Sequence, residues 1–501
     1  MIATALLGLA LVLVLERVYT YDEPLERDIT TYAVVAHEAL GGRALYADLW
    51  DNKSPLVYVT YGAAELVAGY GARAIFLLGV FAATATLLGV YRAAVRMTGS
   101  TGAGLWAAAF WTAVAADQGL QANQPNLEVF MNAALVWAFA EFLADRRRPL
   151  VIGALCAAAS LYKLIVLPVV GLCLAGMIVV ARRERELRRA IVDAGVVVGA
   201  IAVPWTAVLG YFAITGRAAR FNEAVFAYNR AFAGNLASNL VTGVTAYVFP
   251  VQFRVVTGIA LLSVVGVVWL TATRRRRSAA LWSAYAVGTE IAVALPGKFY
   301  GHYFQLWLPV LATGAAVGVH AIARMTMRLA PPPWRRVLPV AAGAAALVAI
   351  LAWELPTYGQ SPDEWSRAKY RTDVFVDAKR TAPVIDAALA PGETFFQWGD
   401  ETELYFYTRR HPPTGLFYGY PMLVVGPLQP ELAARVVRDL ERTRPELLAV
   451  NVGYLYRAME THPVTQWLSR AYYHWAGRDN GPFQLYVRQG GALERRLNAA
   501  R

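Results

Sequence analysis

The stretch that follows the first apolar segment gathers several acids beside a single lysine. It reads YDEPLERDITTYAVVAHEALGGRALYADLWDNKSP, from Tyr21 to Pro55, and its only lysine is Lys53. A carboxylate can take the proton of an attacking hydroxyl, and a cation can hold a phosphate. These residue types therefore suit a group transfer that involves a phosphate, and the question is which acid performs it.

These acids stand in a chain whose composition is typical of membrane proteins. Of its 501 residues 57% are hydrophobic and 16% are charged, and the mean hydropathy is positive. Apolar runs recur up to about Trp353, whereas the later residues are rich in charges and polar aromatic side chains. We predict a membrane domain over residues 1–354 and an extracytoplasmic soluble domain over residues 355–501. Strand-like runs and an amphipathic helix in the second domain favour an α/β fold.

Arginine clusters in the short loops predict how the chain threads through the membrane. With every cluster on the cytoplasmic side, the N-terminus is cytoplasmic and the soluble domain lies outside. About eleven α-helical spans result, over residues 1–19, 74–96, 103–119, 127–144, 149–163, 166–181, 190–213, 253–273, 279–296, 303–323 and 336–354. Because the net charge of +12 comes largely from these loops, we expect membrane lipids and no nucleic acid as partners.

Three segments do not fit as spans and are predicted to lie along the outer face. Residues 29–42 and 217–236 carry apolar groups at helical spacing with polar groups between them, which is typical of interfacial amphipathic helices. Residues 55–71 are apolar, but a crossing there would break the alternation of inside and outside.

Unusual polar residues gather at the predicted outer ends of the spans. Besides the acids of the first loop they include Lys53, Arg73, Asn123, Asn126, Glu128, Lys163, Lys298 and His302. A transporter places ionisable groups along a path near the bilayer midplane, and this sequence has few there. The distribution favours a site at the outer membrane boundary that a lipid-borne substrate reaches from the side.

Each of these residues also has a structural interpretation, which stays open at this point. Lysines at helix ends often extend to the interface without another role, although Lys163 stands in a turn between two short spans. Asp28 and Glu128 each stand near a helix start, where an acid favours the helix dipole. A divalent cation could bind between these two acids, but the chemistry requires no metal or other cofactor. The sequence has no HxxxH zinc pattern and no nucleotide-binding loop.

The first loop resembles that of glycosyltransferase family 39, whose members have the GT-C fold and transfer sugars from polyprenyl phosphates. The family includes protein O-mannosyltransferases and bacterial lipid A aminoarabinose transferases. The residues that match its pattern in order are Asp28, Tyr32, Gly42, Leu45, Tyr46, Asp48, Asp51, Lys53 and Pro55. Arg73 fits the arginine that opens the next span, and GKFYGHYFQLWLP, from Gly297 to Pro309, resembles a later outer loop of the family.

Two positions depart from the family pattern. Asp28 is followed by Ile29, where the commoner pair is Asp-Glu, so a single carboxylate remains there. Ser54 replaces the first proline of the D.KPP element, which we expect to loosen that turn without removing Lys53. Asp22 and Glu23 look like the family pair, but the spacing to Tyr32 selects Asp28.

The resemblance implies a role for each candidate residue. Asp28 would be the base that deprotonates the acceptor hydroxyl, and direct displacement from a β-linked donor would invert the sugar. The residues that would bind the donor and its phosphate are Lys53, Arg73, Lys163, Lys298 and His302. Those that would form the acceptor side or a second polar shell are Tyr32, Asp51, Asn123, Asn126 and Glu128.

We therefore expect a multi-pass glycosyltransferase of a bacterial plasma membrane, with a polyprenyl-phosphate-linked sugar as donor. Its acceptor would be a protein, a lipid or a glycan, and the tyrosines of the soluble domain are candidates for recognising it. A transporter or flippase of lipid-linked sugars and a non-catalytic scaffold remain as alternatives. The glycosyltransferase hypothesis requires Asp28 and Lys53 to share a cavity with Lys163 or Lys298, and this cavity must open sideways to lipid.

Overall fold

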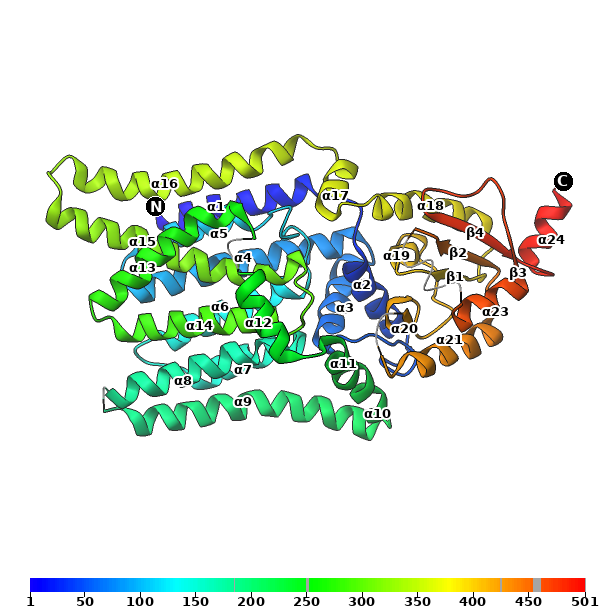
Figure 1. Ribbon diagram of the computed structural model, residues 1–501, viewed down its shortest axis with the longest axis horizontal. Helices are drawn as coiled ribbons and strands as arrows, with labels where there is room; N and C mark the ends of the chain where they lie inside the picture. Colours follow the sequence, from blue (N-terminus) through cyan, green and yellow to red (C-terminus); the bar gives the residue numbers. More distant parts are fainter. Residues whose placement is uncertain (184, 249–251, 424–425, 454–460, 501) are drawn as a thin grey trace.

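The molecule is elongated, with a bundle of helices at one end and a small sheet at the other (Figure 1). A computed structural model describes residues 1–183, 185–248, 252–423, 426–453 and 461–500. The N-terminus begins in the bundle, and the C-terminus lies at the far end of the sheet region.

The bundle contains a helix at every position where a span was predicted. Within the described residues these helices are α1 (Ile2–Tyr19), α4 (Ala72–Thr98), α5 (Thr101–Val114), α6 (Leu127–Phe142), α7 (Pro149–Tyr162), α8 (Leu167–Arg183), α9 (Leu187–Ile214), α13 (Thr257–Ala272), α14 (Arg276–Ala294), α15 (Trp307–Leu329) and α16 (Trp334–Glu354). Seven of them, taken with their flanking turns, are long and apolar enough to cross a membrane: α1, α4, α8, α9, α13, α15 and α16. The remaining four are shorter or less apolar.

The outer surface of the bundle and its loops fit a membrane setting. Large apolar side chains such as Phe81 and Val203 are exposed, as expected of a surface that lipid covers. The arginine-rich connections α8–α9, α13–α14 and α15–α16 lie at the end of the bundle away from the sheet (Figure 1). The predicted polytopic membrane fold is thus confirmed.

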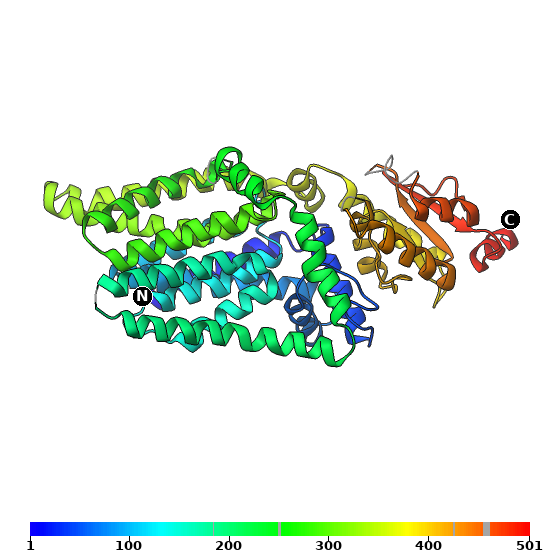
Figure 2. The same ribbon diagram turned by 60° about the horizontal axis from the view of Figure 1, so that its bottom comes forward.

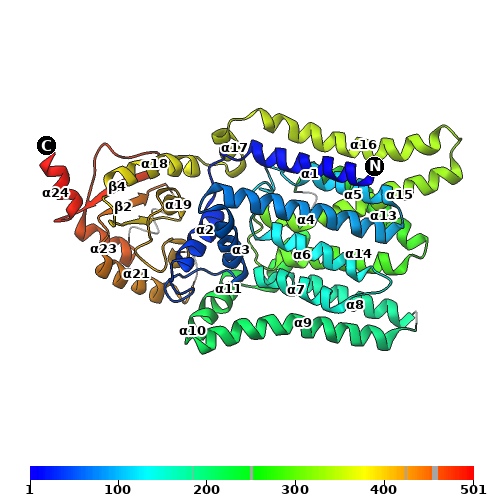
Figure 3. The same cartoon turned by 180° about the vertical axis from the view of Figure 1, so that it is seen from behind.

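Short helices fill the junction between the bundle and the sheet region. They are α2 (Arg27–Leu40), α3 (Leu56–Ala68), α10 (Ala218–Phe221), the π-helical η2 (Asn222–Tyr228), α11 (Asn229–Ala233) and α12 (Leu236–Ala246). Figure 2 shows α10, η2 and α11 running across the end of the bundle, and Figure 3 shows α2 and α3 between the bundle and the sheet region. Helices α2, α3, α10, η2 and α11 are in the segments that were predicted not to cross, whereas α12 was not predicted.

Helix α2 differs from the expected surface helix because almost all of it is buried. The residues from Ile29 to Ala36 are buried without interruption. The cause is tertiary, since α3 packs against α2 from one side and α19 (Glu403–Thr408) from the other. The alternation of apolar and polar residues therefore reflects two protein contacts and not a boundary between lipid and water.

The C-terminal region has the predicted α/β character. Its sheet has the order β1 (Phe395–Trp398), β2 (Leu447–Asn451), β4 (Phe483–Arg488) and β3 (Tyr472–His474). Strands β1 and β2 are parallel, with Phe395 opposite Leu447, and the other pairs are antiparallel. The helices of this region are η5 (Leu355–Gly359), α17 (Pro362–Tyr370), α18 (Val374–Ala388), α19, α20 (Tyr420–Leu423), α21 (Gln429–Thr443), α23 (Pro463–Ala471) and α24 (Ala492–Ala499).

The strands predicted around Phe396 and Leu448 are β1 and β2, and the predicted amphipathic helix is α21. The segments that matter for the site are those that reach the junction, namely α17, α18, the turn after β1 and the segment before α20.

Candidate active site

A cavity of about 620 Å³ opens at the junction of the bundle, the short helices and the C-terminal region. Eight of the predicted site residues line it: Asp28, Tyr32, Asp51, Lys53, Asn126, Glu128, Lys163 and His302. They come from α2, from the loop before α3, from the start of α6 and from the turns after α7 and before α15. Asp28 and Lys53 therefore share a cavity with Lys163, and its opening sideways to lipid stays a prediction.

The start of α2 presents Asp28 to the cavity. Glu26 is the N-cap, and its Oε2 accepts a hydrogen bond of 3.1 Å from the backbone N–H of Asp28. Ile29, the residue that replaces the usual second acid of the family, is fully buried in the core. None of the hydrogen bonds among the described residues uses the carboxylate of Asp28, which leaves its oxygens available to a ligand.

The second carboxylate next to Asp28 is Glu26, two residues before it. Glu26 lines the same cavity, and its Oε1 accepts a hydrogen bond of 3.4 Å from Asn126. Burial and the neighbouring Asp28 raise the pKa of Glu26 to about 8. Glu26 is therefore protonated near neutral pH, while its neighbour carries the negative charge.

The cations of the cavity keep Asp28 ionised. Burial acts to raise the pKa of Asp28, but Lys53, His302 and Lys163 outweigh it and hold the pKa below its usual range. For Lys53, burial acts to lower the pKa, and the carboxylates of Asp28 and Asp51 more than compensate and raise it. Asp28 and Lys53 thus stabilise each other in their charged forms.

The loop that carries Lys53 is fixed by tyrosine hydroxyls. Tyr58 and Tyr418 each donate a hydrogen bond of 2.7 Å to the carboxylate of Asp51, and Tyr46 donates one of 2.7 Å to the backbone oxygen of Lys53. Ser54 is buried here, so the loss of the family's proline leaves a turn that side chains still fix.

Lys163 is positioned by the break between α7 and the 3₁₀ turn η1 (Leu164–Val166). As the C-cap of α7 it is extended, with φ −160°, and this conformation turns the side chain away from the helix. Its Nζ lies 3.2 Å from Oε1 of Glu128 and 3.8 Å from the centre of the Tyr303 ring. Glu128, predicted as an acceptor-side acid, is thus an ion-pair partner of a cavity cation.

Asn126 and Tyr32 form a polar wall of the cavity. The hydroxyl of Tyr32 donates a hydrogen bond of 3.2 Å to Oδ1 of Asn126, which is also the N-cap of α6. His302 lies near them, with Nδ1 3.2 Å from Oε1 of Gln121.

Three predicted site residues lie outside the cavity. Nζ of Lys298 packs 4.4 Å above the ring of Phe232, which lines the cavity, whereas Lys298 itself does not. Arg73 is exposed at the start of α4. Asn123 bonds instead to Glu23 and Lys369, in a buried cluster beside the cavity.

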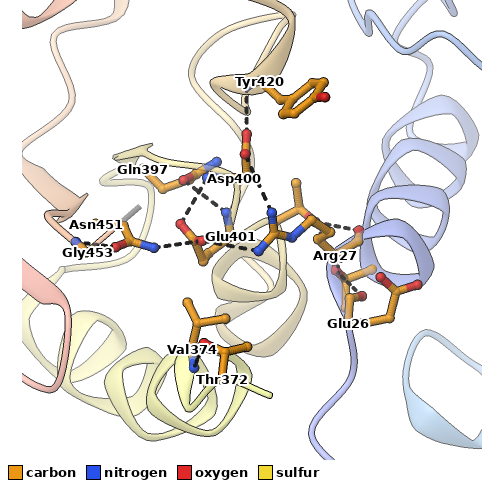
Figure 4. A network of polar contacts seen from close by, with 12 residues as sticks. Glu26, Arg27, Thr372, Val374, Gln397, Asp400, Glu401, Tyr420, Asn451 and Gly453 are labelled. Carbon is orange, nitrogen blue, oxygen red and sulfur yellow. Dashed lines mark hydrogen bonds and ion pairs between the residues drawn. The ribbon is translucent and has the colours of Figure 1, made fainter. Parts of the chain in front are cut away.

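Several cavity residues, such as Glu26, Tyr370 and Asp400, were not found from the sequence, whereas Tyr418 and Tyr420 are among the soluble-domain tyrosines that were candidates for recognising the acceptor. Glu26 was visible in the first loop but did not fit the expected pair. Tyr370, Asp400, Tyr418 and Tyr420 come from the C-terminal region, more than 300 residues after Asp28, and only the tertiary fold brings them here. Figure 4 shows Asp400 and Glu401 beside Arg27 at the start of α2. The acidic GDE turn directly after β1 was the available signal.

The divalent cation considered between Asp28 and Glu128 stays a prediction. Among the described residues no three His, Cys, Asp or Glu side chains converge as metal ligands. One oxygen of Glu128 already contacts Lys163, and Lys53 and Lys163 act on the carboxylate of Asp28.

Comparisons with known proteins identify the fold. No family profile and no curated protein matches the sequence. Two solved structures are similar over 97% of both chains: ArnT from Cupriavidus metallidurans bound to undecaprenyl phosphate, with 16% identity and a TM-score of 0.59, and the same protein in the apo state, with 17% identity and a TM-score of 0.57. At this identity the likeness concerns the architecture, and the chain therefore has the GT-C fold of ArnT in its helical bundle and its C-terminal region alike.

Proposed function

We propose that this protein is a membrane glycosyltransferase that moves a sugar from a polyprenyl-phosphate donor to an acceptor hydroxyl. The observation that carries the proposal is the single cavity in which Asp28, free of hydrogen bonds among the described residues, faces Lys53, Lys163 and His302. The fold supports it, because the similar ArnT structure holds undecaprenyl phosphate.

The cations would bind the phosphate of the donor. Lys53 and Lys163 supply two ammonium groups in a pocket that the protein largely shields from water, where charge-assisted hydrogen bonds are strong. As the bond from C1 to the phosphate breaks, negative charge develops on the leaving phosphate, and fixed cations stabilise it. A lipid-anchored donor also arrives confined to two dimensions, which reduces the entropy cost of the encounter.

Asp28 would act as the base. In the empty site the cations hold its pKa below the usual range, which makes it a weak proton acceptor. A bound phosphate neutralises the charges of Lys53 and Lys163 and thereby raises the pKa of Asp28 toward that of an effective base. Donor binding would thus activate the base, and attack opposite the phosphate would invert C1.

The positive-inside rule gives the orientation. If the arginine-rich connections face the cytoplasm, the cavity and the C-terminal region lie on the extracytoplasmic side. We propose a bacterial plasma membrane as the location, with the polyprenyl-linked donor in the outer leaflet.

The test is transfer of radiolabelled sugar in proteoliposomes that contain undecaprenyl-phosphate-linked hexoses and pentoses. We expect at least one donor to release undecaprenyl phosphate and to lose its label to a water-soluble or lipid acceptor from the cell envelope. Movement of intact donor between leaflets without release of undecaprenyl phosphate would instead indicate a flippase and would contradict the proposal.

A further inference from the structure

The C-terminal region holds the first turn of α2, the turn that carries Asp28. Its contacting segment is residues 399–402, which follows the parallel strand β1 and precedes α19. Thr402 and Arg27 meet at the centre of this contact, and Figure 4 shows how the side chain of Arg27 extends from α2 toward Asp400 and Glu401. The contact lies one residue from the proposed base.

Thr402 makes the closest part of this contact. Its hydroxyl donates a hydrogen bond of 2.9 Å to the backbone oxygen of Arg27 and lies 2.8 Å from the hydroxyl of Thr30 and 2.9 Å from that of Thr31. All three threonines are buried. A displaced Thr402 would leave its own buried hydroxyl unpaired, which costs free energy and favours the geometry seen here. The hydroxyls of Thr30 and Thr31 also bond to the backbone oxygen of Arg27, so all three threonines meet at the first turn of α2.

The charges of the same segment fix the side chain of Arg27. Its guanidinium lies 3.6 Å from Oδ2 of Asp400 and 3.8 Å from Oε1 of Glu401. Both carboxylates have a further partner. The backbone N–H of Tyr420 donates a hydrogen bond of 2.6 Å to Asp400, and the side chain of Asn451 donates one of 2.8 Å to Glu401. Through Asn451, the last residue of β2, the contact with Arg27 is therefore connected to the sheet.

The contact is more than a means of docking two regions. Arg27 and Thr31 line the cavity together with Asp28, and all three belong to the first turns of one helix. A shift of Thr402 would therefore move the carboxylate of Asp28 relative to Lys53 and Lys163, which other elements carry. Misplacement by about 1 Å can cost about a hundredfold in rate.

We propose that Thr402, with Asp400 and Glu401, is a positioning element that sets the geometry of Asp28. This inference rests on the proposed function and gives the C-terminal region a part in catalysis. Because the element touches α2 and does not contact Lys53 or Lys163, the two lysines proposed to bind the phosphate, it should govern turnover and leave donor binding unchanged.

The test compares two substitutions of Thr402 in the full chain. Thr402→Val keeps the shape and removes the hydroxyl, whereas Thr402→Ser keeps the hydroxyl. With the undecaprenyl-phosphate-linked sugar that the wild type turns over, we expect Thr402→Val to lower kcat about ten- to a hundredfold with KM for the donor within threefold. Thr402→Ser should restore kcat to within about threefold of the wild type.

His411→Gln is the matched control. His411 also joins the C-terminal region to α2, through a contact of 2.7 Å with Glu38, but this contact lies at the other end of the helix and outside the cavity. A docking role alone would give this variant an effect similar to that of Thr402→Val, whereas the positioning role predicts kcat within about twofold of the wild type.

Three results would overturn the inference: wild-type kcat in Thr402→Val, an equal loss in Thr402→Val and Thr402→Ser, or a loss confined to KM. If Thr402→Val does not fold, Asp400→Asn decides, because the amide keeps an oxygen for the N–H of Tyr420 and lacks the charge that holds Arg27. A several-fold lower kcat at unchanged KM supports positioning, and an unchanged kcat refutes it. A wild type that neither binds undecaprenyl phosphate nor turns over any donor would instead refute the proposed function.

Discussion

Two groups, each with an acid and a lysine, lie close together at the start of α2. They differ in whether the carboxylate already has hydrogen-bond partners in the protein. In the first, Lys369 donates hydrogen bonds of 3.0 Å to Oε1 of Glu23 and of 2.8 Å to Oδ1 of Asn123. The amide of Asn123 donates a hydrogen bond of 2.5 Å to the other oxygen of Glu23. In the second, Asp28 faces several cations without a hydrogen bond among the described residues.

The comparison shows why residue type alone does not identify a catalytic acid. Glu23 and Asp28 are both acids of one loop, and each has a lysine nearby. The cluster of Glu23, Lys369 and Asn123 is closed, since both oxygens of Glu23 have a partner and none of the three side chains reaches the cavity. Its role is to join the C-terminal region to the bundle, whereas Asp28 keeps unused bonding capacity in a space that can hold a ligand.

Among the variants that test this difference, Asp28→Asn should have the largest effect on activity. Removing the base should lower kcat by about 10²–10⁴-fold at constant folded protein, because the acceptor hydroxyl loses its proton acceptor. The measurement is steady-state transfer from an undecaprenyl-phosphate-linked sugar. Asp22→Asn, an exposed acid of the same loop, is the control and should retain nearly full activity. Similar losses in both variants would contradict the assignment of Asp28.

Lys369→Met should affect stability rather than chemistry. It leaves Glu23 charged and buried without its lysine, which costs about 3–5 kcal/mol of folding free energy. Thermal unfolding of the purified protein measures this loss. The double variant Glu23→Gln/Lys369→Met should recover part of it, because no charge then stays unpaired. A single variant with wild-type stability would show that the buried pair does not hold the regions together.

The cavity lysines should affect donor affinity. Lys53→Met and Lys163→Met each remove a charged hydrogen bond to the phosphate and should weaken binding of undecaprenyl phosphate by about 10–100-fold. Lys298→Met is the control, since this lysine packs on Phe232 and does not line the cavity, and the affinity of this variant should stay within about threefold of the wild type. Binding in lipid nanodiscs is the readout. An effect of Lys298→Met as large as that of Lys53→Met would place the phosphate elsewhere.

The smallest effect is a shift in pH dependence. Lys53 is the leading cation among those that lower the pKa of Asp28, so Lys53→Met should raise that pKa. The base must be ionised to accept a proton, and activity is lost as the pH falls through its pKa. The acid limb of kcat at saturating donor should therefore move to higher pH in the variant. If the acid limb of the kcat profile stays in place or moves to lower pH, Lys53 does not lower the pKa of the base, which would contradict the pairing of Lys53 with Asp28.

The helices were predictable from local pattern alone. Apolar runs and basic loops are features of consecutive residues, and each predicted span contains a helix of the bundle. The burial of α2 was not predictable, because α19, which covers it, follows more than 350 residues later.

The candidate site was predictable in part. Spacing within the first loop led to Asp28 and Lys53, which do share a cavity. Lys298 was expected in the cavity because it is predicted to lie on the outer side of the membrane. That prediction does not show which neighbour the side chain packs on, and in the fold it packs on Phe232. Glu26 was missed because the family pattern puts the second acid after Asp28. In this chain the N-cap geometry turns the side chain of Glu26 back toward the start of the helix instead.

In the proposed reaction Asp28 accepts the proton of the acceptor while cations of the same cavity hold the phosphate of the donor. A single-turnover experiment with Asp28→Asn in nanodiscs tests both halves at once, with the labelled donor that the wild type turns over. We expect the variant to retain the donor with at least wild-type affinity, because a negative charge beside the phosphate is gone, and to leave the sugar uncleaved. Cleavage at the wild-type rate, or loss of donor binding, would contradict it.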